Sequence, residues 1–204
     1  MSARKSNYKM TMSNLKMMDR IGRLTLLLVL GLPCLAPRCY GQKPDAYSAV
    51  AIGTGGPAGG KSIQFDFRIT RYTTDQELMK YVELLKTGGA DALRKALEKE
   101  DVGRLAPVAG IGNQIALARK RQAGADTIIT IVTARIMPFV ELYRSGRSTD
   151  YQFGYLQVKL NAKGEGTGTI MAAAKIRFDK KKGQYEIESY GNQYIKATNV
   201  RALK

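Results

Sequence analysis

Alternation of apolar and polar side chains between residues 63 and 70 constrains the fold of this chain most strongly. Every second residue there is a large apolar side chain, at Ile63, Phe65, Phe67 and Ile69. Successive side chains of a strand point to opposite faces, so this pattern predicts a β-strand with one buried face. The aromatic and β-branched residues favour the same structure.

A second segment, nearer the C-terminus, predicts a hairpin with a definite register. Its turn lies at residues 179–183. On the apolar face, Phe178 then lies opposite Tyr185. On the polar face, Arg177 lies opposite Glu186. A shift of one residue in the pairing would set apolar side chains against charged ones, so the pattern fixes the register.

Two helices are expected between these strands, as an insertion at about 74–100. Thr74 and Glu77 have the spacing of a capping box, in which each side chain accepts a hydrogen bond from the other residue's backbone. The glycines at 88–89 predict the end of the first helix, because glycine readily adopts the left-handed conformation found there. A second helix is expected at about 91–100.

From residue 102 onward the apolar residues again have the period of strands. The run at 127–134 is apolar on both faces, which is typical of a central strand. Connections between the expected strands are short, which favours antiparallel neighbours. The sequence therefore predicts an α+β fold that is mainly antiparallel β. We expect a curved sheet, a sandwich or a partly closed β-barrel with a two-helix insertion.

The apolar run at residues 24–32 follows a basic stretch and precedes a segment with two prolines. This order is typical of a secretory signal peptide, and the run is shorter than the roughly 20 apolar residues of a membrane-spanning helix. We expect no transmembrane helix after cleavage.

The expected cut lies after Gly41, where Cys39 and Gly41 supply the small residues that the signal peptidase requires. A cut after Ala36 is the alternative. Residues 1–41 would then be a signal peptide. Residues 42–204 would form a single exported domain, periplasmic or extracellular.

The chain contains no histidine, and both cysteines, Cys34 and Cys39, precede the expected cut. The mature domain would therefore lack Ser-His-Asp and Cys-His catalysis and zinc sites built on His or Cys. We expect no catalytic residues, no metal and no cofactor. The alternative is a small enzyme that uses carboxylate or lysine chemistry.

The chain carries 33 Lys and Arg residues against 17 Asp and Glu residues, a formal net charge of +16. Such an excess favours contact with anionic surfaces. The expected partner is an anionic polysaccharide, a lipid headgroup or an acidic protein, rather than nucleic acid.

Residues 55–62 match the phosphate-binding pattern G-x-x-x-x-G-K-[ST]. In a P-loop a helix follows the loop at once, and its N-terminus contributes to phosphate binding. Here the alternating strand follows instead. We therefore expect a glycine-rich connection that can lie over a ligand, with nucleotide binding as the remaining alternative. Its residues are Gly53, Gly55, Gly56, Gly59, Gly60, Lys61 and Ser62.

A second candidate ligand loop lies before the strand expected near residue 155. It contains two arginines beside an acid and a tyrosine, at Arg144, Arg147, Asp150 and Tyr151. Guanidinium groups suit a carboxylate, a sulfate or a sugar phosphate. An ordinary hairpin loop with solvated side chains is the alternative.

Three segments, at 52–56, 147–154 and 172–178, resemble a family of uncharacterised exported bacterial proteins. The resemblance implies a single exported domain and brings no activity, cofactor or site with it. From the residues and the resemblance we expect an exported, non-enzymatic binding or structural domain that contacts an anionic partner in the envelope.

Overall fold

Antiparallel strands dominate the computed structural model, which describes residues 43–54, 59–139, 149–192 and 194–203. Within these residues the elements are β1 (Asp45–Gly53), β2 (Ser62–Ile69), α1 (Asp75–Leu97), β3 (Gly103–Pro107), β4 (Asn113–Ile115), β5 (Leu117–Ala123), β6 (Asp126–Thr133), β7 (Phe153–Leu160), β8 (Glu165–Asp179), β9 (Gln184–Ser189), a 3-10 turn (Tyr190–Asn192) and β10 (Ile195–Leu203).

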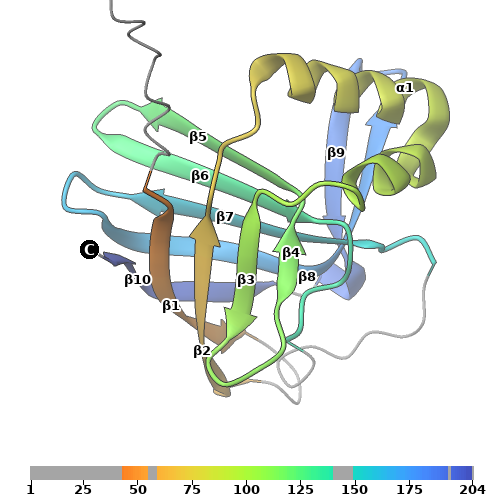
Figure 1. Cartoon of the computed structure of the whole chain (residues 1–204). Helices are drawn as coiled ribbons and strands as arrows, with labels where there is room; N and C mark the ends of the chain where they lie inside the picture. Colours follow the sequence, from red (N-terminus) through yellow and green to blue (C-terminus); the bar gives the residue numbers. More distant parts are fainter. Residues whose placement is uncertain (1–42, 55–58, 140–148, 193, 204) are drawn as a thin grey trace, which may run out of the picture. The chain divides into compact units, whose positions relative to one another are not determined.

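Nine strands form a nearly closed barrel in the order β4-β3-β2-β1-β10-β8-β7-β6-β5. The two ends of this order meet because only Ala116 separates β4 from β5 along the chain. Its N–H donates to the Val132 carbonyl at 2.9 Å, while the Val102 N–H donates to the Ile115 carbonyl at 2.9 Å. β9 lies off this path and extends the sheet beside the end of β8 (Figure 1). The expected antiparallel β fold is confirmed, in its barrel form.

The prediction of two helices is wrong. A single helix, α1, spans Asp75–Leu97, and Gly89 kinks it with φ 71° and ψ −167°. Only glycine enters this backbone region readily, so the chain turns at Gly89 and then resumes the helix. The helix continues because Leu85 before the kink and Leu93 after it are both buried in the same cluster. The predicted capping box is confirmed at its start: the Glu77 N–H donates to Thr74 Oγ1 at 3.2 Å, and the Thr74 N–H donates to Glu77 Oε2 at 2.7 Å.

Replacement of the kink glycine distinguishes this helix from a regular one. We expect Gly89→Ala to lower the free energy of unfolding by about 1–3 kcal/mol, because alanine is strained in this backbone region. A Cβ at this position would meet no heavy atom within 4 Å, so the loss is conformational. In a regular helix the same change would stabilise the protein by about 0.5–1 kcal/mol. Urea unfolding shows whether the free energy of unfolding falls or rises in Gly89→Ala. The exposed Lys80→Ala variant is the control.

The predicted hairpin register is also confirmed. Phe178 pairs with Tyr185 and Arg177 with Glu186 across β8 and β9. The Arg177 guanidinium lies 2.8 Å from a Glu186 carboxylate oxygen. The apolar face of this hairpin packs against α1, as part of a hydrophobic cluster outside the barrel.

Two hydrophobic clusters separate the barrel interior from the contact with α1. Inside the barrel, Phe65 contacts Phe67 and Phe139, with ring centroids 6.2 and 5.3 Å away. On the outer face, α1 buries its apolar side against β5–β9. Its buried residues are Tyr81, Leu85, Leu93 and Leu97. Figure 1 shows α1 beside β9, with its axis across the ends of the strands.

Candidate binding groove between α1 and the sheet

Outward-facing side chains of β5, β6, β7 and β8 form three rows whose polarity changes with distance from α1. In order away from the helix, the rows are Leu117, Val132, Tyr155 and Met171; then Arg119, Thr130, Gln157 and Thr169; then Arg121, Ile128, Lys159 and Thr167. Neighbouring rows are two residues apart on each strand, about 7 Å. The sheet surface therefore passes from apolar to polar to basic within three rows.

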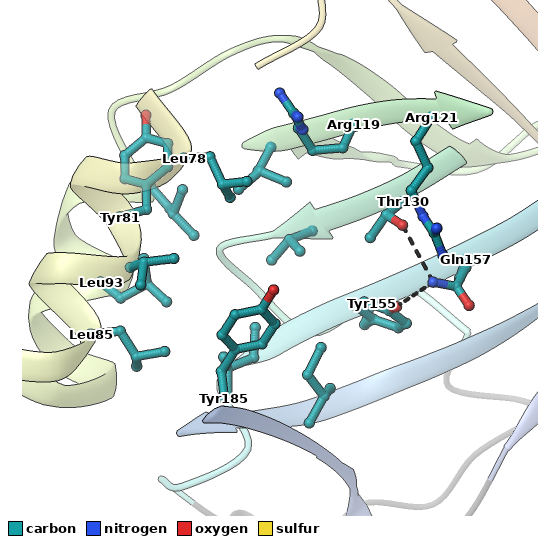
Figure 2. A pocket seen from close by; sticks show the side chains of 16 residues that line it. Leu78, Tyr81, Leu85, Leu93, Arg119, Arg121, Thr130, Tyr155, Gln157 and Tyr185 are labelled. Carbon is teal, nitrogen blue, oxygen red and sulfur yellow. Dashed lines mark hydrogen bonds between the residues drawn. The ribbon is translucent and has the colours of Figure 1, made fainter. Parts of the chain in front are cut away.

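A half-open groove of about 440 Å³ lies between these rows and α1. Figure 2 shows Leu78, Leu85 and Leu93 on the helix at one side. On the sheet, Arg121 and Gln157 lie at the side away from the helix. Volumes of about 300–1,000 Å³ are typical of small-molecule sites. The size and the mixed lining make this groove the strongest candidate site among the described residues.

The helix wall of the groove follows from helical spacing. Leu78, Tyr81, Val82 and Leu85 recur at intervals of three and four residues and share one face of α1. The kink at Gly89 keeps the next turns of the helix on the same sheet, where Leu93 and Leu97 continue the wall.

Polar groups at the open side of the groove are joined by hydrogen bonds. Gln157 Nε2 donates to Tyr155 Oη at 3.0 Å and to Thr130 Oγ1 at 3.4 Å (Figure 2). Burial raises the pKa of Tyr155, and the opposing effects of Thr130 and Arg121 are smaller. The Tyr155 hydroxyl therefore stays protonated at neutral pH and presents a polar, uncharged group to the groove.

The two arginines of the groove differ in whether they form an ion pair. Arg119 Nη1 donates to the Thr73 carbonyl at 2.7 Å, and Nη2 is ion-paired with Asp75 at the start of α1. Arg121 makes no ion pair with any residue that the structure describes. Its side chain is exposed, and its positive charge acts on Tyr155. Arg121 is therefore the cation in the groove that is available to an anionic ligand.

The glycine-rich loop predicted from the sequence is the connection of a hairpin. The Gly53 N–H donates to the Lys61 carbonyl at 3.0 Å, and the Gly60 N–H donates to the Gly53 carbonyl at 3.4 Å. Gly59 lies in the turn, and Ser62 begins β2, so a strand and not a helix follows Lys61 and Ser62.

Two glycines of that loop, Gly55 and Gly56, lie outside the described residues. Of the loop residues that the structure does describe, none lines the groove. The described part of the loop therefore lacks the helix N-terminus that a P-loop uses.

The second predicted loop is described only at its C-terminal end. Asp150 Oδ2 accepts a hydrogen bond from Lys175 Nζ at 2.8 Å, and this contact raises the pKa of Lys175. The Tyr151 ring lies edge-on to that of Tyr190 at 5.2 Å. Arg144 and Arg147 lie outside the described residues. Asp150 thus contacts β8, Tyr151 contacts the 3-10 turn at Tyr190–Asn192, and neither lines the groove.

A third group of polar residues gathers at the start of β1. Tyr72 Oη donates to Asp45 Oδ2 at 2.6 Å, and Lys120 Nζ lies 3.0 Å from the same oxygen. Burial raises the pKa of Asp45, but the contacts with Tyr72 and Lys120 outweigh it, so the pKa lies below its usual range. Burial and the hydrogen bond to Asp45 raise the pKa of Tyr72. The cluster is therefore an ion pair between Asp45 and Lys120 with a hydrogen bond from the neutral Tyr72.

The Asp45 cluster predicts a pH-dependent contribution to stability. Because the folded-state pKa of Asp45 is lowered, its contribution is complete above the ordinary pKa of about 4 and is lost as the pH falls through the folded value. We expect Asp45→Asn to cost about 1 kcal/mol at pH 7, and this difference from wild type to shrink as the pH falls below about 4. Urea unfolding across this range tests it, with exposed Asp66→Asn as the control. A difference that is the same at every pH would contradict the expectation.

Within the described residues, no group of three or more His, Cys, Asp or Glu side chains could hold a metal ion. None of the helices described is long and apolar enough to cross a membrane. No family model, curated protein or solved structure matches the chain. The geometry of the groove is therefore the basis for a functional proposal.

The sequence does contain one local signal for this groove, at residues 117–121. Arg119 and Arg121 are two residues apart in a strand, so they share a face with Leu117, while Lys120 points to the other face and reaches Asp45. The alternation at residues 117–121 therefore predicts one strand face that passes from apolar to basic.

Proposed function

We propose that the chain is an exported, non-enzymatic binding domain that holds a ligand with an anionic group in the groove between α1 and the sheet. The proposal is carried by the position of Arg121. This residue lies at the polar side of an otherwise mainly apolar groove and forms no ion pair with any acid that the structure describes. A cation placed there favours anionic ligands over neutral ones.

The lining of the groove supports binding over catalysis. Its polar side chains are Arg119, Arg121, Thr130, Gln157 and three tyrosines, with no carboxylate and no lysine among the described residues that line it. General acid–base and covalent catalysis usually draw on groups of those kinds or on histidine and cysteine.

A thermal-shift screen of the purified chain tests the proposal. Its ligands are anionic amphiphiles, sulfated and neutral polysaccharides, acidic peptides, anionic lipid vesicles and Mg-ATP, each at low and high salt. A ligand that binds the folded state raises the melting temperature. We expect the shift to disappear in Thr130→Trp, which fills the groove floor, and to remain in Thr167→Trp, outside the groove on β8. A shift that is equal in both variants would reject the groove as the site.

The alternative is a small enzyme with carboxylate or lysine chemistry. Its best candidate is the Asp45 cluster, where Asp45 Oδ2 and Lys120 Nζ are 3.0 Å apart. It predicts a turnover that Asp45→Asn abolishes while the protein stays folded. The nucleotide alternative predicts a Mg-ATP shift that Lys61→Ala removes. Either result would replace the binding proposal, because neither residue lines the groove.

A further inference from the structure

We infer that the ligand of the groove is a monomeric single-chain amphiphile, an unbranched hydrocarbon chain with one anionic head group. The inference rests on the proposed binding function and names its ligand class. Three features carry it: the apolar lining of the groove, the single unbalanced cation at one side, and the small exposed area of the helix wall.

The apolar part of the groove suits a hydrocarbon chain. Nine of its 16 lining residues are Leu, Val or Ile, supplied by α1, β5, β6, β8 and β9. The side-chain polar groups that form hydrogen bonds within the lining, at Thr130, Tyr155 and Gln157, lie together on the sheet away from the helix (Figure 2). A sugar or a nucleotide needs hydrogen-bond partners along its whole length, whereas a hydrocarbon chain needs none.

The charges beside the groove select an anionic head. Arg119 is balanced by Asp75, and Lys159, in the next row, is balanced by Asp126 at 2.9 Å. Among the described residues of the three rows, Arg121 is the one cation without an acidic partner. A carboxylate, sulfate or phosphate placed beside it gains a charge-assisted hydrogen bond and leaves the hydrocarbon chain directed toward α1.

The small exposed area of the helix wall favours a single free molecule over a bilayer surface. Leu85 and Leu93 are each 5% exposed and Leu97 only 1%. These side chains face the sheet across the groove and present little area to an external surface. A membrane surface contacts side chains that project outward, whereas a single small molecule needs only the space of the groove itself.

Calorimetric titration with octanoate, decanoate and dodecanoate, each below its micelle concentration, tests the inference on the full chain. Each added methylene should tighten binding about fourfold, which corresponds to about 0.8 kcal/mol per buried methylene. Decanoate should bind at least about tenfold more tightly than a neutral decyl glycoside. Arg121→Gln should abolish that preference and keep the methylene increment. Arg201→Gln, an exposed arginine of β10 outside the groove, should change neither.

The outcomes separate this inference from the proposed function. Affinity that does not change with chain length overturns the amphiphile, and the binding function stands if a polar compound still gives a shift that Thr130→Trp removes. Binding to vesicles of anionic phospholipid without binding to free decanoate also overturns it, in favour of a membrane surface. No shift with any compound in the screen overturns both proposals.

Discussion

The Phe65→Ala variant is expected to unfold with a free energy about 3–5 kcal/mol below that of the wild-type chain. Phe65 has no exposed surface and lies in the interior of the barrel. Its ring packs edge-on against Phe139, with centroids 5.3 Å apart, and contacts Phe67 on its own strand. Truncation removes these contacts and leaves a cavity that the surrounding strands can fill only in part. Urea unfolding followed by circular dichroism measures the loss.

The control for this prediction is Tyr185→Ala. Tyr185 is 59% exposed, so its removal should cost less than about 1 kcal/mol. A loss below about 1.5 kcal/mol for Phe65→Ala would contradict the packing of the barrel interior. If that variant does not fold, Phe65→Leu gives the same test at a smaller volume change. Ligand binding should survive in Phe65→Leu, because the groove belongs to the other hydrophobic cluster.

Local patterns predicted the strands and the last hairpin because the information lies in adjacent residues. In β2, Phe65, Phe67 and Ile69 are buried, as the alternation requires, and Ile63 at the strand's beginning is only partly buried. The β8–β9 register followed from side chains of opposite charge facing each other, and the Arg177 guanidinium does contact Glu186.

Long-range contacts set the features that local patterns did not predict. Closure of the barrel depends on the pairing of β1 with β10, from opposite ends of the described chain, and on the step from β4 to β5 at Ala116. The glycines at 88–89 predicted a helix end, but burial of Leu93 and Leu97 on the sheet continues the helix beyond them.

The groove also depends on long-range contacts that local sequence patterns do not predict. The run at 127–134 is apolar on both faces, which predicted a central strand, and β6 does lie between β5 and β7. The reason for its two apolar faces emerges only in the fold: Ile129 and Ile131 face the barrel interior, while Val132 lies in the cluster with α1. The sequence showed that both faces are covered but not that a helix leaves a groove over one of them.

The Leu97→Ala variant is expected to lower the free energy of unfolding by about 2–5 kcal/mol. Leu97 ends α1 and is 1% exposed, within the cluster that joins the helix to the outer face of the barrel. Since this cluster is separate from the barrel interior, the change weakens the attachment of α1 and leaves the interior packing intact. Hydrogen exchange measured by mass spectrometry should show α1 losing protection at a lower free energy than β6 and β7.

Leu78→Ala is the matched control for Leu97→Ala, because Leu78 lies on the same face of α1 and is only partly buried. Its smaller apolar burial should give a smaller loss of stability and of protection. Equal loss of protection in α1 and in the strands of the barrel would show that the helix opens only when the barrel unfolds. Loss of protection in α1 alone would instead show that the helix can open while the barrel stays folded. Such opening would give an amphiphile a route into the groove.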